Sequence, residues 1–536
     1  MNAPLLLTHF LERARTIFPH SQIVSQRPDR TRVRQSYAQL ADRAAQLAHG
    51  LTALGVGRGD RVATLCWNHR EHLEAYLGVP AMGAVVHTLN LRLHPNDIGY
   101  IARHAEDRVL IVDRSLLPLY AKFAAMVPSI ERVIVVGDDG PVDSAGSQLD
   151  YERVLAAQPT RFDYPRLDEN AAAMICYTSG TTGNPKGVVY SHRSTVLHTL
   201  VTCMHDTLGV RHSDVVLPVV PMFHAAAWGL PYSSVATGAT LVLPGPHLDA
   251  PSLVKLMEEE RVTLAAGVPT IWLALLDLLD REGDQHDLSS LRSTLIGGSA
   301  APASLIDGFA RRHGIGVTHA WGMTETNPLG TLAGLKRGHE GLTPEERLRR
   351  TSSQGFAVPF VELRHVDDAG VILPTDGATM GELEVRGPWV AASYFGDEDG
   401  ERFTSDGWFK TGDVVTLDGE GYIRIADRSK DVIKSGGEWI SSVALENALM
   451  SHPAVLEAAV FAGRDDKWGE RPLAAVVFKS GQSASDDQLR AHLGGMFARF
   501  QLPDRFIAMA QIPRTSTGKF LKSRLREEHG GWGSGR

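Results

Sequence analysis

Apolar runs and amphipathic segments alternate along residues 60–136 of the chain. Short runs of β-branched and other apolar residues predict strands, and longer segments with apolar positions at helical spacing predict helices. The predicted strands are 61–67, 84–90, 108–113 and 132–136, and the predicted helices are 69–81, 95–104 and 116–126. Because strands that alternate with helices are typical of parallel sheets, this region predicts a sheet with helices on both faces.

The same alternation returns later in the chain, and then it stops. Between residues 188 and 319 the predicted strands lie near Val215, Leu241, Thr263, Leu295 and Val317. After Gln354 the pattern changes to short strands separated by turns, which favours antiparallel pairing, and a small unit with strands and helices follows from about Ser429. We therefore expect an α/β fold. It has a large N-terminal domain of doubly wound sheets with a small antiparallel β subdomain, and a small α+β C-terminal domain.

Residues 215–248 contain no Asp, Glu, Lys or Arg. A charge-free stretch of this length could indicate a transmembrane helix, which needs about 20 consecutive apolar residues. Prolines at positions 218, 221, 231, 244 and 246 interrupt the stretch and disfavour such a helix. We expect buried strands and loops around an apolar cavity, and no integral membrane segment.

The charge balance argues against nucleic acid as a partner. Lys and Arg number 54 against 62 Asp and Glu, a net charge of −8, whereas proteins that bind nucleic acid present basic surfaces. The three cysteines, at positions 66, 176 and 203, are widely spaced and show no metal-binding pattern. Sparse cysteine fits a reducing compartment, and the first residues lack the layout of a signal peptide. We therefore expect a cytoplasmic protein.

Two histidines at the start of a predicted helix, His69 and His72, have the spacing of helical metal ligands. Asn68 is a good candidate for the residue that caps this helix. In that case both histidines belong to the first turn, and we expect them to be solvated side chains rather than zinc ligands.

A loop rich in hydroxyl groups and glycine separates two predicted strands, 171–176 and 187–190. Glycine lets backbone N–H groups turn inward and approach a ligand closely, and such a concave backbone binds anionic oxygens. A lysine in the same loop adds a positive charge, so the ligand that this loop suits is a polyphosphate. The residues expected to contact it are Thr178, Ser179, Gly180, Thr181, Thr182, Gly183 and Lys186.

The loop differs from the phosphate-binding loop of P-loop NTPases. In that motif a Ser or Thr follows the lysine and a helix comes next. Here Gly187 follows Lys186, and the chain continues as a strand. An ordinary polar surface turn is the other interpretation, but the density of hydroxyl and glycine residues between two apolar strands is far from average composition.

Taken with further motifs, the loop resembles the phosphate-binding signature of the adenylate-forming superfamily. This superfamily includes acyl-CoA synthetases, amino-acid adenylation domains and luciferases. The resemblance extends over residues 36–524, and the segments 67–90, 221–232 and 434–450 are most similar to bacterial medium- and long-chain fatty-acyl-CoA ligases. Several independent motifs in the same order make the match specific.

The second motif is AWGMTETNP, residues 320–328, which follows a predicted strand at 315–319. Ligands of open α/β sheets lie at the carboxyl ends of strands. By resemblance, Glu325 and Thr181 hold Mg²⁺ on ATP, and Thr324 hydrogen-bonds the phosphate or the adenylate. Trp321 occupies a position that is often Tyr, and the resemblance implies that it stacks near the adenine. Gly322 and Met323 belong to the same nucleotide site.

The third motif, GGSAAP at 297–302, follows a predicted strand at 293–296. The resemblance implies that Gly298, Ser299 and Ala300 contact the adenine, because small residues let a flat ring lie against the backbone. An ordinary strand-to-helix turn, with Pro302 at the first helical position, accounts for the same residues nearly as well.

The fourth motif surrounds Asp413. A carboxylate offers paired acceptors to two adjacent ribose hydroxyls, and the resemblance gives Asp413 this role with Arg428 in support. Lys430 occupies the hinge position between the large and the small domain. The residues that match the loop lining the coenzyme A thiol channel, after the small domain has turned, are Lys434, Gly436, Gly437 and Trp439.

The last motif is PRTSTGKFLK, residues 513–522. By resemblance, Lys519 is the catalytic lysine of the first half-reaction, and Glu325, Thr181 and His224 are further catalytic residues. The chemistry calls for a cation there, because a carboxylate that attacks the α-phosphate brings two anions together. The other interpretation of a lone lysine near a C-terminus is an idle, solvent-exposed side chain.

The resemblance implies a two-step reaction. Acid and ATP·Mg²⁺ give an acyl-adenylate and pyrophosphate, and coenzyme A then displaces AMP to form a thioester. Residues 1–428 would form the large domain that binds ATP and the acyl group, and residues 429–536 the small, mobile domain that carries the catalytic lysine. The partners would be a small-molecule carboxylic acid, ATP and coenzyme A, and a homodimer is left open.

The charge-free stretch bears on the substrate. Amino-acid adenylation domains pair the substrate ammonium with an Asp near His224, and none is present here. Because burying an unpaired ammonium costs several kcal/mol, an acid with an apolar tail is favoured, with His224 and Trp228 at the acyl pocket. Alternatives are a short thioether or aryl acid such as methylmercaptopropionate, a separate carrier protein in place of coenzyme A, and a non-catalytic nucleotide sensor.

Overall fold

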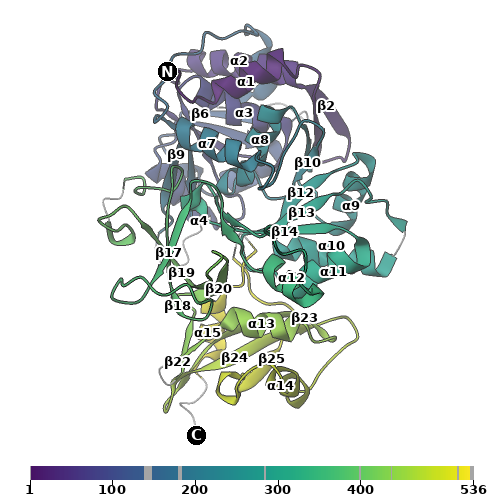
Figure 1. The fold of residues 1–536 in the computed structure, drawn as a ribbon. Coiled ribbons are helices and arrows are strands. Elements are labelled where there is room, and N and C mark those ends of the chain that lie inside the picture. The colour runs from purple at the N-terminus through teal and green to yellow at the C-terminus, as the bar shows by residue number, and fades with distance from the viewer. Residues whose placement is uncertain are drawn as a thin grey trace.

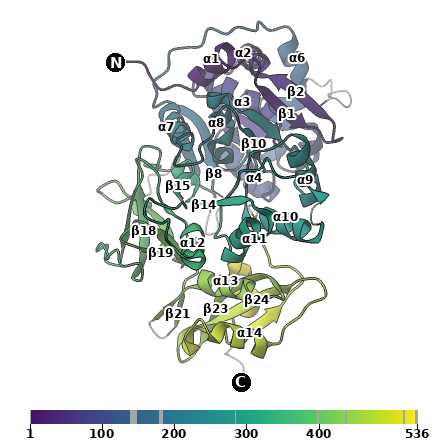
Figure 2. The ribbon, with the colours of Figure 1, turned by 45° about the vertical axis from the view of Figure 1, so that its right-hand side comes forward.

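The structure is a computed structural model that describes residues 2–137, 148–178, 184–282, 285–396, 400–435, 438–515 and 518–531. The described residues form four sheets. Two of them lie in a large upper body, one extends from its lower side, and the last belongs to a small C-terminal body below (Figures 1 and 2). The expected α/β architecture, with a large N-terminal part and a small α+β C-terminal part, is confirmed.

The first sheet forms from the N-terminal third of the chain, as its alternating pattern predicts. Its strands are β3 (Arg61–Leu65), β4 (Val85–Thr88), β5 (Val109–Asp113), β6 (Arg132–Val136), β7 (Gln148–Asp150), β8 (Ala172–Tyr177) and β9 (Gly187–Ser191). Their order in space is β7-β6-β5-β3-β4-β8-β9, and every neighbouring pair is parallel except β8 with β9. The helices of this region are α2 (Tyr37–Ala53), α3 (Arg70–Ala81), α4 (Pro95–His104), α5 (Leu117–Tyr120) and α6 (Tyr151–Ala156).

The second sheet has the order β16-β15-β14-β13-β12-β10-β11-β1-β2. Its strands are β1 (Gln22–Gln26), β2 (Arg32–Ser36), β10 (Val215–Pro218), β11 (Thr240–Leu243), β12 (Leu264–Gly267), β13 (Ser293–Ile296), β14 (Gly316–Gly322), β15 (Leu329–Leu332) and β16 (Phe356–Ala357). Its helices are α1 (Thr8–Thr16), α7 (His192–Thr202), α8 (Leu230–Thr237), α9 (Ala250–Glu259), α10 (Pro269–Glu282), α11 (Ala303–His313) and α12 (Pro344–Thr351). The run from β1 to β14 is parallel.

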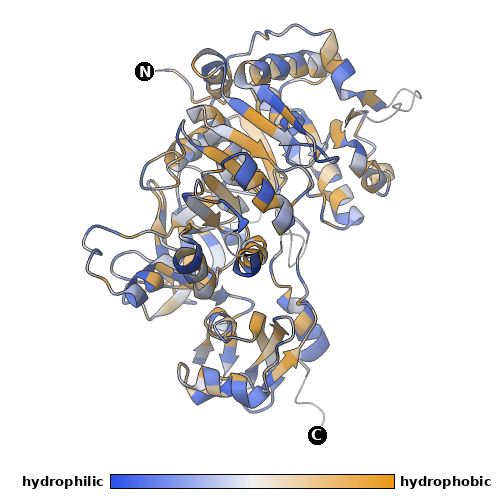
Figure 3. Cartoon of the chain, turned by 90° about the vertical axis from the view of Figure 1, so that its right-hand side faces the viewer, coloured by the Kyte–Doolittle hydropathy of each residue, from blue (hydrophilic) through white to orange (hydrophobic). Residues whose placement is uncertain are grey.

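The two large sheets share one apolar core. Helix α3 lies between them, because it contacts β1 of one sheet and β3, β4 and β8 of the other. Hydrophobic residues are concentrated in the strands of this body in Figure 3. Asn68, just before α3, joins the sheets directly, since its Nδ2 donates to the carbonyls of Pro218 and Val220 and its Oδ1 accepts from the Met222 N–H.

The remaining sheets carry the C-terminal third. The antiparallel sheet contains β17 (Glu362–Val366), β18 (Met380–Arg386), β19 (Phe409–Leu417) and β20 (Ile423–Arg428). The small body contains β21 (Ile433–Ser435), β22 (Glu438–Ile440), β23 (Val455–Asp465), β24 (Gly469–Phe478) and β25 (Arg505–Ala508), with helices α13 (Ser442–Met450), α14 (Asp486–Gly494) and α15 (Lys522–His529). The antiparallel pattern expected after Gln354 is therefore confirmed.

Within residues 60–136, two expectations about local structure are wrong. Residues 116–126 are not one helix but a sequence of short turns, with α5 limited to Leu117–Tyr120. Pro118 accounts for the late start, because proline lacks an N–H and fits only the first turn of a helix.

The second error concerns the histidines, which are buried rather than solvated, with His69 9% exposed and His72 fully buried. His69 itself caps α3. Its two ring nitrogens lie 3.1 Å from a Glu71 oxygen and 3.0 Å from an Asp113 oxygen, and these carboxylates raise its pKa although burial opposes the charge.

The charge-free residues 215–248 form buried strands and turns, as expected, and also the short helix α8, which the pattern did not predict. Between β10 and α8 the chain makes a left-handed turn, with φ of 37°, 49°, 49° and 57° at residues 225, 226, 227 and 228. Non-glycine residues rarely adopt this conformation, and each costs about 1–2 kcal/mol. In the described part of the chain, every helix is too short or too polar to cross a bilayer.

Candidate active site

A cavity of about 850 Å³ lies where the large body, the antiparallel sheet and the small body meet. Many of the candidate residues line it, although they come from positions that are hundreds of residues apart. The candidates in its lining are Thr178, Lys186, His224, Trp228, Gly298, Ser299, Ala300, Trp321, Gly322, Met323, Thr324, Glu325, Asp413, Arg428, Lys430 and Lys519.

Two residues of the hydroxyl- and glycine-rich loop are held by the β8–β9 pair. The Thr178 N–H donates to the Lys186 carbonyl at 2.9 Å, and the Lys186 N–H donates to Thr178 Oγ1 at 3.2 Å. The Lys186 ammonium lies 4.8 Å from the centre of the Tyr394 ring. The other loop residues, Ser179, Gly180, Thr181, Thr182 and Gly183, fall outside the described residues.

Glu325 lies in a short 3₁₀ helix, Thr324–Thr326, and is 6% exposed. Its Oε1 accepts a 2.7 Å hydrogen bond from the Tyr394 hydroxyl, and the Tyr190 hydroxyl donates to the Thr324 carbonyl at 2.7 Å. Sequence reasoning missed both tyrosines. Tyr394 belongs to no motif, Tyr190 was taken only as the end of a strand beside the loop, and their partners are 69 and 134 residues away. Glu325 can therefore present its carboxylate to the cavity in a fixed orientation.

Strand β14 is longer than expected. We placed its end at His319, but it continues through Trp321 and Gly322, where it pairs with β15 in antiparallel fashion and contains a bulge. The first residues of the motif at 320–328 are therefore part of the strand rather than the loop after it. The strand holds Trp321 at 5% exposure in the wall of the cavity.

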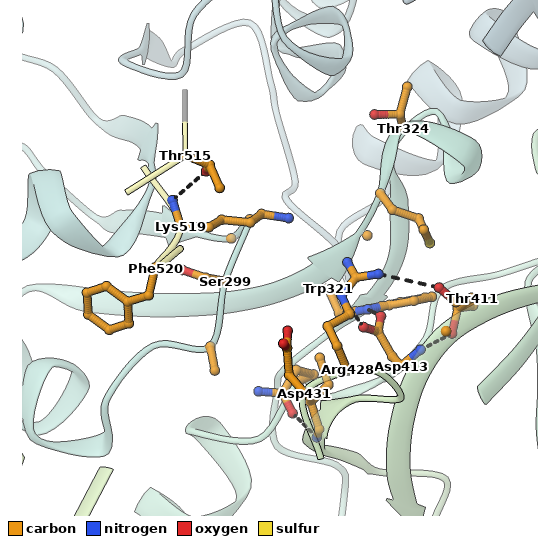
Figure 4. A pocket seen from close by; sticks show the side chains of 18 of the residues that line it. Ser299, Trp321, Thr324, Thr411, Asp413, Arg428, Asp431, Thr515, Lys519 and Phe520 are labelled. Carbon is orange, nitrogen blue, oxygen red and sulfur yellow. Dashed lines mark hydrogen bonds and ion pairs between the residues drawn. The ribbon is translucent and has the colours of Figure 1, made fainter. Parts of the chain in front are cut away.

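Asp413 lies on β19 and is 2% exposed. One carboxylate oxygen, Oδ1, is 2.8 Å from Nε of Arg428, and the other, Oδ2, accepts a 2.8 Å hydrogen bond from Nε1 of Trp321. The Asp413 N–H donates to Oγ1 of Thr411 at 3.0 Å. Figure 4 shows these contacts gathered on one side of the cavity.

The loop after β13 makes close contact with Trp228. A Cβ atom at Gly297 would lie 3.3 Å from the Trp228 ring, and Gly298 has a φ of 84° that side chains rarely adopt. Both glycines thus let the chain pass close to the indole, and Ser299 and Ala300 follow in the wall of the cavity. Pro302 is the N-cap of α11, one position before the place that we expected.

Lys519 comes from the small body, in a turn whose backbone is fixed by hydrogen bonds. The Thr515 N–H donates to the Lys519 carbonyl at 2.8 Å, and the Lys519 N–H donates to Thr515 Oγ1 at 3.1 Å. In Figure 4 the Lys519 side chain extends into the space between Ser299 and Thr324. Among the candidate catalytic residues in the lining of the cavity, Lys519 is the one that the small body contributes.

The surroundings of Lys519 weaken its hold on a proton. Burial is the largest cause, and the positive charges of Arg428 and Lys430 add to it, so that the pKa falls to about 8. The carboxylates of Asp413 and Glu325 act in the opposite direction. An anionic ligand in the cavity would favour the charged form of Lys519 and pair with it.

Apolar side chains also line the cavity. They include Trp228, Leu208, Pro269 and Leu273. Burial lowers the pKa of His224 to about 4, with smaller contributions from the charges of Lys519 and Arg92, so this histidine is neutral near pH 7. An acid with an apolar tail suits these side chains better than one with a charged tail.

A buried ionic cluster joins the small body to β20. Nζ of Lys522 lies 2.8 Å from Glu446 Oε1 and 3.6 Å from Asp427 Oδ2, and Ser442 Oγ hydrogen-bonds both Lys522 and Asp427. Burial, more than any other cause, raises the pKa of Glu446 to about 7. Asp427 lies near the end of β20, and Lys430 lies in the turn between β20 and β21. The cluster is therefore beside the expected hinge.

The candidates for the coenzyme A channel are not at the cavity. Lys434 and Trp439 face each other on the β21–β22 hairpin, with the lysine ammonium 5.1 Å from the centre of the indole. Neither belongs to the described residues that line the cavity. Gly436 and Gly437 fall outside the described residues.

Comparisons with known proteins agree with this arrangement. Residues 12–395 match the family model described as "AMP-binding enzyme", and residues 444–519 match its C-terminal domain model. The chain is 49% identical to a long-chain-fatty-acid–CoA ligase of Thermus thermophilus over 99% of this chain and 96% of that protein. It is 45% identical to a 3-methylmercaptopropionyl-CoA ligase of Ruegeria pomeroyi over 98% of each. Its fold is similar to that of the anthranilate CoA ligase AuaEII in complex with anthranoyl-AMP, with a TM-score of 0.88, 28% identity and 98% coverage of both chains.

Proposed function

Because the chain belongs to the AMP-binding enzyme family, we propose that it is an ATP-dependent acyl-CoA ligase that activates a medium- to long-chain fatty acid. The acid would first react with ATP to give an acyl-adenylate and pyrophosphate, and coenzyme A would then release AMP and form the thioester. The observation that carries this proposal is the entry of Lys519 into a cavity that also contains Glu325 and the Asp413–Arg428 pair.

In the first step, Lys519 would offset the repulsion between the attacking carboxylate and the α-phosphate. Its side chain extends into the cavity between Ser299 and Thr324, two residues that would contact the nucleotide. Lys186 and Thr178 would contact the outer phosphates, as their loop position suggests. Removing an electrostatic donor of this kind typically slows a reaction by about 10²–10³-fold.

The nucleoside would occupy the wall formed by β14, β19 and the loop after β13. Asp413 would accept hydrogen bonds from the ribose, with Arg428 beside it, and Gly298, Ser299 and Ala300 would contact the adenine. The buried carboxylate of Glu325 offers oxygen ligands of the type that Mg²⁺ prefers. We propose that Glu325 and Thr181 hold this ion, which would neutralise phosphate charge on ATP.

The second step needs a different position of the small body. Lys434, Gly436, Gly437 and Trp439 would approach the thiol channel only after a rotation about Lys430, because the hairpin that carries them is away from the cavity in this arrangement. We accordingly propose that residues 1–428 act as the substrate-binding domain and residues 429–536 as the moving domain.

Several features favour a fatty acid as the substrate. The cavity is lined by the neutral His224 and by apolar side chains that include Trp228. Each methylene buried against them would contribute about 0.8 kcal/mol. The 45% identity to a 3-methylmercaptopropionyl-CoA ligase favours a second candidate, a short thioether acid. We further propose a cytoplasmic enzyme, and a homodimer as one form of its assembly.

The test is a panel of acids with purified protein, ATP and Mg²⁺. Saturated acids of two to eighteen carbons, methylmercaptopropionate and benzoate are compared, and pyrophosphate and AMP are measured with and without coenzyme A. We expect AMP release that depends on coenzyme A and peaks at one chain length of eight carbons or more. A peak at methylmercaptopropionate would select the second candidate. Pyrophosphate release that ignores coenzyme A would point to a carrier-protein acceptor, and silence with every acid would contradict the proposal.

A further inference from the structure

We propose that Trp321 is a positioning residue, which fixes the Asp413 carboxylate so that its remaining lone pairs receive the two ribose hydroxyls of ATP. This inference rests on the proposed function, because it deepens the role of the ribose site. It differs from the stacking role that the sequence resemblance implies for Trp321. The indole edge, through its N–H, is the functional part in this proposal.

The geometry at Asp413 leaves room for two hydrogen bonds, and a ribose offers two hydroxyls. An ionised carboxylate has about four lone-pair directions. Arg428 occupies one on Oδ1 and Trp321 occupies one on Oδ2, both at 2.8 Å. Among the described residues these are the side-chain partners of the carboxylate, so one direction remains for a ligand on each oxygen. A carboxylate that is clamped on both oxygens can meet the 2′- and 3′-hydroxyls without first reorienting.

The surrounding chain is shaped for an indole at position 321. Strand β14 has its bulge between Trp321 and Gly322, and a bulge changes the direction in which a side chain points. Gly330 on β15 supplies the space, since a Cβ atom there would lie only 2.4 Å from Cζ3 of the Trp321 ring. The indole therefore fits against Gly330 while its N–H reaches Asp413.

The contact is also buried, which increases its value. Trp321 is 5% exposed and Asp413 is 2% exposed, so water competes little for the hydrogen bond. A hydrogen bond to a charged group contributes about 1.5–3 kcal/mol, which corresponds to roughly tenfold to hundredfold in affinity. Without the indole N–H, Oδ2 would lose its protein donor, and the carboxylate could turn about Arg428.

The test measures nucleotide binding, without acid or coenzyme A, by isothermal titration calorimetry. ATP, 2′-deoxy-ATP and 3′-deoxy-ATP are titrated into the wild type and into Trp321→Phe. We expect the wild type to prefer ATP over both deoxy analogues. Trp321→Phe should bind ATP about tenfold more weakly and the deoxy analogues nearly as well as the wild type does, so that the preference for ATP largely disappears.

Two further variants make the result specific. Trp389→Phe is the matched control, because Trp389 is also buried and its Nε1 donates to the Leu329 carbonyl at 3.0 Å, but it does not line the described cavity. Its preference for ATP should equal that of the wild type. Gly330→Ala keeps the indole but crowds it, and should reduce the preference as Trp321→Phe does. Thermal unfolding of each variant checks that the fold is retained.

The outcomes separate this inference from the proposed function. If Trp321→Phe and Gly330→Ala weaken ATP and the deoxy analogues equally, Trp321 acts only through packing or stacking and the inference is wrong, while the proposed ligase stands. A wild type that binds all three nucleotides equally would overturn the inference together with the ribose role of Asp413. A wild type that binds no ATP would overturn the proposed function as well.

Discussion

The hydroxyl of Tyr394 donates a 2.7 Å hydrogen bond to Oε1 of Glu325, across 69 residues of sequence. The ring of the same tyrosine lies 4.8 Å from the Lys186 ammonium. One side chain thus contacts both a candidate metal ligand and a candidate phosphate ligand. It links the antiparallel side of the molecule to the nucleotide end of the cavity.

Replacing Tyr394 with Phe should loosen Glu325 while leaving the ring in place. Because a hydrogen bond to a charged group contributes about 1.5–3 kcal/mol, we expect kcat/KM for pyrophosphate formation to fall about tenfold or more. The Mg²⁺ concentration that gives half-maximal rate should rise as well. Tyr232→Phe is the control, because Tyr232 is buried and its hydroxyl bonds a backbone carbonyl elsewhere in the core. An unchanged Mg²⁺ requirement in Tyr394→Phe would contradict the proposal that Tyr394 orients Glu325 as a ligand of the metal.

The proton on Lys519 should control the first half-reaction. The folded protein lowers the pKa of this ammonium to about 8, so the charged form declines as the pH rises past 8. We expect the rate of acyl-adenylate formation to decline over the same range. Lys519→Ala should lose about 10²–10³-fold in this rate, and Lys519→Arg should show a flatter alkaline limb, because arginine stays charged.

The measurement for Lys519 is pyrophosphate release between pH 6.5 and 9.5. Lys479→Ala serves as the control, because that lysine is exposed on the small body, and it should match the wild type at every pH. Equal rates for Lys519→Ala and the wild type would contradict the proposed first step.

The buried cluster around Lys522 should be a weak point of the small body. Lys522→Met leaves Glu446 buried without its cation, and breaking a buried ion pair typically costs about 3–5 kcal/mol. We expect the urea midpoint of the small body to fall. Adding Glu446→Gln should restore much of the loss, because the neutral amide needs neither the Lys522 ammonium nor a bound proton. If the double variant is no more stable than Lys522→Met, the destabilisation has another origin, such as lost packing.

Acid should unfold the protein partly through its buried histidines. Burial lowers the pKa of His198 to about 3, and its Nε2 accepts a hydrogen bond from the Leu329 N–H. Because the folded pKa lies below the unfolded value of about 6.5, the neutral histidine favours folding above pH 6.5. That stability is lost as the pH falls toward 3, at about 1.4 kcal/mol per pH unit.

The check is the free energy of unfolding in urea, measured from pH 7.5 to 4.5. His198→Gln should have a shallower dependence on pH than the wild type, whatever its stability at pH 7.5. His205→Gln is the control, because the His205 side chain is 96% exposed. Parallel curves for His198→Gln and the wild type would rule out this histidine as a source of acid sensitivity.

The sequence predicted best where a local signal and the global fold agree. Helix α4 begins and ends where expected, because Pro95 suits the first helical position and the pattern ends at His104. The prediction of one helix at 116–126 was wrong, because it followed the apolar spacing and ignored the effect of Pro118. Strand β14 was placed too short, since its extension depends on pairing with β15, which follows a turn that the pattern does not reveal.

The site shows the same limit. Asp413 and Lys519 were identifiable because each lies within a short recognisable motif. The structure brings both residues into one cavity. Tyr394 was not, because it lies in an irregular segment and its partner is distant in sequence. His69 was misjudged for a related reason, since the carboxylate of Asp113 that lies beside its ring comes from another strand.

The depressed pKa of Lys519 also couples two equilibria, docking of the small body and binding of the nucleotide. A lysine in water holds its proton more tightly than this one does in the cavity, so at neutral pH the charged side chain opposes docking of the small body on an empty site. An anionic nucleotide reverses that effect, because it favours the charged lysine beside it. By reciprocity, whatever ATP gains from a docked Lys519, docking gains from bound ATP. The enzyme would then assemble its catalytic arrangement in proportion to the nucleotide it holds.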